Sequence, residues 1–228
     1  HDAIGRLQEI YGVVPKSLPR ALADRKPVPG FVQVITGVRR CGKSTAMLQM
    51  RTKRGAAGSV FMNFESPLLD GFAVGDFTRL DHVLRDLKCE RLFLDEVQAL
   101  PRWEILVRQL LDLGLQVTVS GSNASLLGRE LGTKLTGRHL SDELFPFSYG
   151  EFLAYTRRTA SDVSLRDYLN RGGFPEYLRS GEETVLASLF NDILFRDIAS
   201  RHGVRETARL RSLALWLAAN IGGRVSAG

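Results

Sequence analysis

The chain has 228 residues, of which 44% are hydrophobic and 25% are charged, a balance typical of a folded globular protein rather than a disordered one. No apolar run approaches the roughly 18 residues of a membrane span, and two cysteines are too few for a disulfide framework or a zinc site. These features predict a cytoplasmic protein with no membrane partner.

The net charge of +6 is concentrated near the amino terminus. Residues 1–60 hold eleven lysines and arginines and three acidic residues, whereas residues 61–228 hold twenty and twenty-two. A local basic excess is expected either of a face that binds nucleic acid or of a site for a polyphosphate. The spacing of glycines within the same region favours the polyphosphate.

Short apolar, β-branched runs alternate with stretches of helical periodicity along the first two thirds of the chain. Residues 1–30 contain four prolines, and this predicts only short helices and turns in a lead-in segment. The predicted strands are residues 31–36, 60–64, 91–94 and 116–120. The predicted helices are residues 43–53, 80–87 and 103–113. This alternation predicts an α/β fold in which helices sandwich a parallel sheet.

After residue 145 the strand patterns disappear and helical stretches follow. Ser148 and Glu151 have the spacing of a capping box, which predicts a helix that begins there. Because the chain begins with His1 and ends directly after a helical stretch, we expect a fragment of a longer protein. The expected parts, with a boundary near Pro146, are a lead-in at 1–30, an α/β domain at 31–146, a smaller helical, lid-like domain at 147–220 and the start of a further domain at 221–228.

Residues 37–44, with the sequence GVRRCGKS, match every fixed position of the phosphate-loop pattern G-x-x-x-x-G-K-[ST]. Glycines let the backbone curl so that successive N–H groups point toward phosphate oxygens, and the following helix turns its positive end toward the same anion. In this pattern Lys43 reaches the β- and γ-phosphates and the Ser44 hydroxyl holds Mg²⁺. A predicted strand precedes the motif and a predicted helix follows it, as a phosphate loop requires.

Two acidic residues, Asp95 and Glu96, follow the predicted strand at 91–94. Asp95 would orient Mg²⁺ through its water shell, and Glu96 would polarise a water molecule for attack on the γ-phosphate. Polar residues also follow the strand at 116–120, where Ser120, Ser122 or Asn123 would sense the γ-phosphate or orient water. Ordinary turn chemistry explains these three residues equally well.

Together these stretches resemble the AAA+-type P-loop ATPases, in the part of that group that includes archaeal-ATPase-like and STAND-like proteins. The resemblance covers most of residues 30–220. Its matching stretches are ITGVRRCGKST at 35–45, FMNF at 61–64, LDEVQ at 94–98, VSGSN at 119–123, LTGR at 135–138, LFPFSY at 144–149 and GGFPE at 172–176. Members usually continue into a winged-helix segment and a C-terminal domain of unknown function.

The resemblance implies a nucleotide site along the whole phosphate loop. The residues that would bind ATP and Mg²⁺ are Gly37, Val38, Arg39, Arg40, Cys41, Gly42, Lys43, Ser44 and Thr45. Cys41 is a departure from the group, which more often has a small aliphatic residue there. Arg39 and Arg40 would either contact phosphate or pair with nearby acids.

The resemblance also implies roles outside the loop. Asp95 would orient the metal, Glu96 would be the general base, and Ser120 or Ser122 would occupy the sensor position. Arg138 is a candidate arginine finger, a residue that often comes from a neighbouring subunit, and an ordinary surface or ion-paired arginine is the alternative.

The leading prediction is a Mg²⁺-dependent ATPase that couples hydrolysis to conformational change, with Glu96, Lys43, Asp95 and Arg138 as catalytic residues. One alternative is a slowly hydrolysing, nucleotide-gated switch, and another is a DNA-associated regulatory module. A metabolite kinase is disfavoured because Glu96 is placed to activate water. The expected partners are ATP, further copies of the chain, and DNA through the group's C-terminal region, with only weak DNA binding by the chain itself.

Overall fold

Five parallel strands form one sheet within the residues described by the computed structural model, which are 2–122, 135 and 137–222. The strand order is β2-β3-β4-β1-β5. The strands are β1 (Val32–Thr36), β2 (Ser59–Asn63), β3 (Arg91–Asp95), β4 (Gln116–Gly121) and β5 (His139–Glu143). The first four confirm the strands predicted from the sequence, and the α/β fold class is confirmed with them.

The sequence patterns do not predict β5, whose residues are HLSDE. This strand pairs with β1 at the edge of the sheet, and its side chains are partly or fully exposed to solvent. An edge strand with little buried surface needs few apolar side chains, so the apolar pattern that marks the other strands is missing here.

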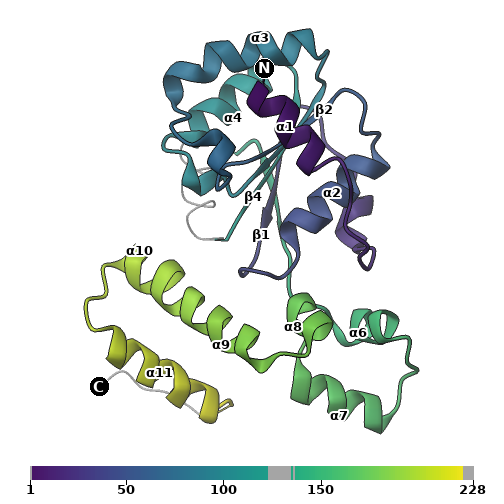
Figure 1. Cartoon of the computed structure of the whole chain (residues 1–228), viewed down its shortest axis with the longest axis vertical. Coiled ribbons are helices and arrows are strands. Elements are labelled where there is room, and N and C mark those ends of the chain that lie inside the picture. Colours follow the sequence, from purple (N-terminus) through teal and green to yellow (C-terminus); the bar gives the residue numbers. More distant parts are fainter. Residues whose placement is uncertain (1, 123–134, 136, 223–228) are drawn as a thin grey trace. The chain divides into compact units, whose positions relative to one another are not determined.

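Helices cover both faces of this sheet (Figure 1). One face packs against α1, α3 and α4, where Val34 and Leu94 join the buried cluster, and the other packs against α2 through Ile35, Phe61 and Phe93. Neighbouring strand positions fall into different clusters because side chains alternate along a strand. These helices are α1 (Asp2–Ile10), α2 (Lys43–Lys53), α3 (Phe77–Asp86) and α4 (Trp103–Asp112), and short 3₁₀ turns occupy Ala21–Asp24, Pro67–Leu69, Val74–Asp76 and Val97–Ala99.

The strand order brings three chain segments to one edge of the sheet. β4 lies between β1 and β3, with Thr36 opposite Gly121 and Leu94 opposite Val119. Since all strands run in the same direction, the residues that follow β1, β3 and β4 emerge together at their carboxyl ends. The phosphate-loop motif, the acidic pair and the polar residues after β4 therefore share one edge.

The chain divides into two compact units at 1–175 and 176–228. α6 (Tyr149–Thr156) and α7 (Asp162–Arg171) therefore belong to the first unit. The Phe147 N–H donates to the Gly173 carbonyl at 2.7 Å, and the Tyr168 hydroxyl donates to the Phe147 carbonyl at 2.9 Å. A Cβ on Gly173 would lie 2.0 Å from the Phe147 carbonyl oxygen, so the close return of the chain requires glycine.

The second unit is helical. It contains α9 (Glu183–Asp192), a π-helical segment (Ile193–Ala199), α10 (Ser200–His202) and α11 (Thr207–Ala219), and almost all of α8 (Pro175–Ser180). None of the helices in the described part of the chain combines the length and apolar character needed to cross a bilayer.

Candidate functional site

The loop between β1 and α2 carries the phosphate-loop motif, and its backbone depends on glycine. Gly37 has a φ of +145° and Gly42 a φ of +105°. A Cβ on Gly37 would lie 2.2 Å from the carbonyl oxygen of Leu144, just after β5, so no side chain fits there. Gly42 is the N-cap of α2 and contributes no side chain to the first turn. The N–H groups of that turn and the positive helix end form a surface suited to phosphate.

The Lys43 side chain is buried and folds back over the loop. Its ammonium donates to the carbonyl oxygens of Gly37 and Val38, each at 3.1 Å. Its Nζ also lies 3.8 Å from Glu96 Oε1. An ammonium held by loop carbonyls can exchange them for phosphate oxygens, which make stronger, charge-assisted hydrogen bonds.

Asp95, the last residue of β3, is completely buried and held by three polar side chains. Ser120 donates to Asp95 Oδ1, and Asn63 Nδ2 donates to Asp95 Oδ2 at 3.2 Å. The Ser44 hydroxyl also interacts with this carboxyl. Asp95 and Ser44 supply hard oxygen donors from two elements at one point, which is the donor chemistry that Mg²⁺ prefers.

Burial raises the pKa of Asp95 to about 6, because removal from water disfavours the charged carboxylate. The hydrogen bonds from Ser120 and Ser44 and the charge of Lys43 lower the pKa, while the charge of Glu96 raises it. Desolvation is the largest of these effects. A buried acid that ionises near neutral pH is suited to a site where a cation compensates its charge.

Glu96 adopts the left-handed region, with a φ of +53°, directly after β3. Its backbone N–H donates to Ser120 Oγ at 3.2 Å, and Gln98 Nε2 donates to Glu96 Oε2. These contacts direct Oε1 toward Lys43. The carboxylate therefore lies beside the phosphate loop, where a general base for water would have to be.

The polar residues after β4 have different surroundings. The Ser120 hydroxyl is fully engaged by Asp95 and Glu96, so it positions the acidic pair. The buried Ser122 Oγ has no hydrogen-bond partner among the described residues, which leaves it as the candidate for the sensor role. Asn123 lies outside the described residues.

The other predicted loop residues, at positions 38–41, have surroundings different from those of Lys43 and Asp95. Val38 is exposed, and Arg39 lies 3.6 Å from Glu65 Oε1. Arg40 has a φ of +60° and an exposed side chain. Cys41 is buried, and burial raises the pKa of its thiol, so it packs as a neutral side chain.

Arg138 does not lie near these residues within its own chain. It directly precedes β5, at the amino-terminal edge of the sheet, and its carbonyl accepts from the Val32 N–H. Its guanidinium lies 3.4 Å from Asp112 Oδ1. The phosphate loop is at the opposite edge, so any contact of Arg138 with nucleotide requires a second copy of the chain.

Three further residues, Asn63, Tyr11 and Arg20, complete the surroundings of the site. Asn63 lies in FMNF at 61–64, one of the stretches that resemble the AAA+-type ATPases, but its position at the end of β2 does not by itself predict a role in the nucleotide site. Its amide binds Asp95 and also interacts with the hydroxyl of Tyr11, whose ring stacks on Phe61 at a centroid distance of 4.7 Å. Arg20, from the lead-in, donates to the Cys41 carbonyl of the loop at 3.1 Å. No pattern in the sequence marks Arg20 or Tyr11.

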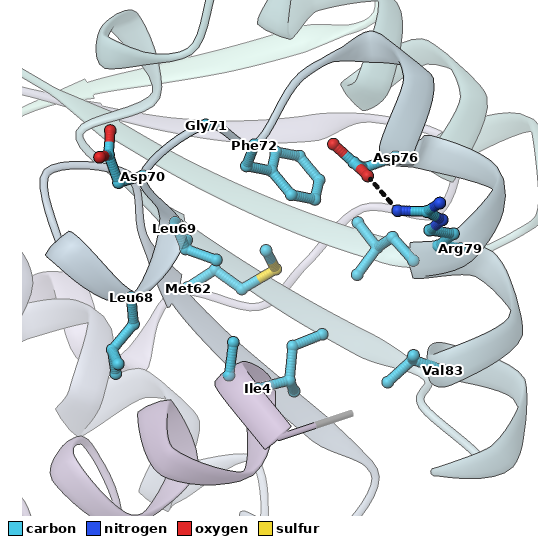
Figure 2. Close-up of a pocket in the computed structure, with 12 residues that line it drawn as sticks. Ile4, Met62, Leu68, Leu69, Asp70, Gly71, Phe72, Asp76, Arg79 and Val83 are labelled. Atoms are coloured by element: carbon cyan, nitrogen blue, oxygen red, sulfur yellow. Dashed lines mark hydrogen bonds and ion pairs between the residues drawn. The ribbon is translucent and has the colours of Figure 1, made fainter.

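A separate cavity of about 400 Å³ lies between α1, the loop after β2 and α3 (Figure 2). Ile4, Met62 and Val83 line it with apolar surface, and Asp76 and Arg79 pair at its side. None of the predicted nucleotide-site residues lines this cavity, so it is distinct from the phosphate-loop edge.

A parallel sheet with a glycine-rich loop after β1 and a buried acid at the end of β3 defines the P-loop nucleotide-binding class. A family model described as an AAA domain matches residues 30–153, more than half of the chain. The chain belongs to this family.

The curated relatives extend well beyond this chain. It is 32% identical over 214 residues to the uncharacterized protein MJ1544 of Methanocaldococcus jannaschii, covering 86% of this chain and 48% of that protein. It is 35% identical over 209 residues to an uncharacterized protein of Haemophilus influenzae, covering 84% of this chain and 52% of that protein. The chain therefore spans about half the length of these relatives.

Two solved structures are also similar to this chain. One is PCH-2 of C. elegans, with a TM-score of 0.42 and 14% identity, covering 75% of this chain and 47% of that one. The other is AMPPCP-bound DnaA from Aquifex aeolicus, with a TM-score of 0.43 and 13% identity, covering 96% and 78%.

Proposed function

We propose that the chain binds ATP with Mg²⁺ and hydrolyses it, and that hydrolysis drives a conformational change. The observation that carries the proposal is the 3.8 Å approach of the Lys43 ammonium to Glu96, beside an Asp95 carboxyl that also contacts Ser44. This arrangement joins a phosphate-binding loop, oxygen donors for a metal and a candidate base for water in one place.

Each of these residues has a distinct task in the proposed reaction. Lys43 and the first-turn N–H groups of α2 bind the β- and γ-phosphates and neutralise their charge. Ser44 and Asp95 would hold Mg²⁺, which supplies charge stabilisation at the phosphate oxygens. Glu96 accepts a proton from the attacking water. Ser120 keeps the two acids in place through its hydrogen bonds to both.

The pH dependence of the metal requirement tests this proposal. We expect phosphate release from ATP only with Mg²⁺, and an apparent Mg²⁺ affinity that is flat above pH 6. Because the Asp95 pKa is about 6, a proton must leave the carboxyl below that pH before it can hold a metal. The affinity should then fall about tenfold per pH unit. Mg²⁺ titrations of phosphate release between pH 5 and 8 measure this.

The control is Asp95→Asn, which shows the part of the pH dependence that comes from protonation of ATP itself. Equal slopes below pH 6 in the parental chain and the variant would exclude Asp95 from the metal site. Phosphate release that survives chelation of Mg²⁺ would overturn the proposed function. The same raised pKa affects the stability of the metal-free protein in the opposite sense to its effect on Mg²⁺ affinity. The neutral Asp95 carboxyl stabilises the fold at low pH, and this contribution to the free energy of unfolding is lost as the pH rises through about 6.

The position of Arg138 gives a prediction about assembly. If Arg138 acts as an arginine finger, it must reach the site of a second copy, so turnover per chain should rise with protein concentration. Arg138→Ala should lower turnover at high concentration by about a thousandfold or more without changing ATP affinity. Mixing it with Lys43→Ala should restore activity, because each variant supplies what the other lacks. Constant turnover per chain, unaffected by Arg138→Ala, would leave Arg138 as the ion-pair partner of Asp112.

A further inference from the structure

Arg20 is a buried arginine of the lead-in that contacts three separate parts of the first unit, with only 5% of its surface exposed. Its Nη1 donates to the Cys41 carbonyl at 3.1 Å, and its Nη2 donates to the Phe145 carbonyl at 2.7 Å. Its Nε lies 2.8 Å from Glu151 Oε1, and the guanidinium covers the Phe147 ring at 5.1 Å from the centroid. The two Nη atoms therefore donate to the phosphate loop and to the segment after β5, while the charge of the guanidinium pairs with Glu151 in the first turn of α6.

The backbone of the same residue is fixed to the helix that the phosphate loop opens. The Arg20 N–H donates to Gln49 Oε1 at 2.9 Å, and Gln49 lies on α2. The Gln49 amide in turn donates to the Leu18 carbonyl at 2.8 Å and to Ser17 Oγ at 3.0 Å. Because Arg20 is held at both its backbone and its guanidinium, its orientation relative to the loop is fixed.

The contact with Cys41 determines the direction of the next N–H group. The peptide bonds of the described residues are trans, so the Cys41 carbonyl and the Gly42 N–H point in opposite directions. Arg20 holds the carbonyl toward the lead-in and α6, and the Gly42 N–H must therefore face away from them. Gly42 has no side chain and a φ of +105°, so its own conformational preference does little to fix this peptide.

We propose that Arg20 is a positioning residue for the nucleotide: it holds the Cys41 carbonyl so that the Gly42 N–H points at phosphate, and its ion pair with Glu151 makes this orientation depend on α6. The inference rests on the proposed function. It assigns the lead-in a role in ATP binding, and it gives α6 a direct route by which its movement changes phosphate affinity.

The test compares Arg20→Lys, Glu151→Gln and the double variant. Lysine keeps the charge but cannot form the fork that reaches Cys41 and Glu151 together. Glutamine at position 151 keeps the capping box with Ser148, since glutamine serves there as well as glutamate, and removes only the charge of the pair. The matched control is Arg25→Lys. Arg25 lies in the same lead-in segment as Arg20, but it pairs with Asp142 of β5 and not with the phosphate loop.

The readouts are the dissociation constant for a non-hydrolysable ATP analogue with Mg²⁺ and the thermal unfolding midpoint without nucleotide. We expect Arg20→Lys to weaken the analogue about tenfold, the value of one charge-assisted hydrogen bond, and Arg25→Lys to leave it unchanged. Glu151→Gln should weaken binding about threefold in the parental chain and not at all in the Arg20→Lys background, because Glu151 acts through Arg20.

The outcomes separate this inference from the proposed function. A parental chain that does not bind the analogue would overturn the proposed function itself. Binding by the parental chain with equal affinity in Arg20→Lys, or additive losses in the double variant, would overturn the positioning role alone. If Arg20→Lys fails to fold, Glu151→Gln decides: unchanged affinity there refutes the coupling of the loop to α6. A change in unfolding midpoint without a change in affinity would show that Arg20 only stabilises the fold.

Discussion

Replacing Lys43 by alanine should weaken ATP binding by at least about a hundredfold, because it removes the buried ammonium that would contact the β- and γ-phosphates. In the free protein this ammonium donates to the Gly37 and Val38 carbonyls, and it lies 3.8 Å from Glu96. The variant therefore also leaves the loop carbonyls and the Glu96 carboxylate without their cation. Calorimetric titration with ATP and Mg²⁺ measures the loss.

The matched control is Lys53→Ala, at the other end of the same helix. Lys53 is half-exposed and pairs with Asp24, far along α2 from the loop, so ATP affinity should stay at the parental value. Both variants should unfold cooperatively, and circular dichroism checks this. ATP affinity that is the same in Lys43→Ala and in the parental chain would show that the loop does not hold phosphate, and the proposed ATPase activity would be excluded with it.

The sequence predicts the sheet and the phosphate loop well because their features are local. β1, β3 and β4 are short apolar runs that need no partner to be recognised, and the loop is defined by spacing within eight residues. Asp95 and Glu96 are likewise marked as site residues by their place directly after the predicted strand at 91–94. The strand order then brings these local features to one edge, which is a consequence of parallel strands rather than of any further pattern.

The features that the sequence does not predict depend on distant contacts. β5 is polar because most of its side chains are not buried, so only its pairing with β1 identifies it. The hydrogen bond from the Phe147 N–H to the Gly173 carbonyl joins residues on either side of α6 and α7, so only the folded chain reveals it. Arg20 resembles any other basic residue of the lead-in until its three partners, 21, 125 and 131 positions away, are known.

Replacing Glu96 by glutamine should preserve ATP binding and reduce turnover by about a hundredfold to a thousandfold, because a general base contributes that much and an amide cannot accept the proton. Glutamine has the same shape, and the backbone contact from Glu96 N–H to Ser120 Oγ remains. The dissociation constant for ATP should therefore stay within about threefold of the parental value. Binding and phosphate release are measured on the same preparation, so the two effects can be separated.

The control for this variant is Glu90→Gln, just before the opposite end of the same strand, where the exposed carboxylate lies beside Arg91 and away from the loop. It should leave both binding and turnover unchanged. Parental turnover in Glu96→Gln would require another group to accept the proton, and the surroundings of Asp95 argue against that residue because its carboxyl is completely buried and engaged by Ser120 and Asn63. Loss of binding together with turnover would instead show that the 3.8 Å contact between Lys43 and Glu96 is needed to shape the loop, which would make Glu96 a positioning residue rather than the base.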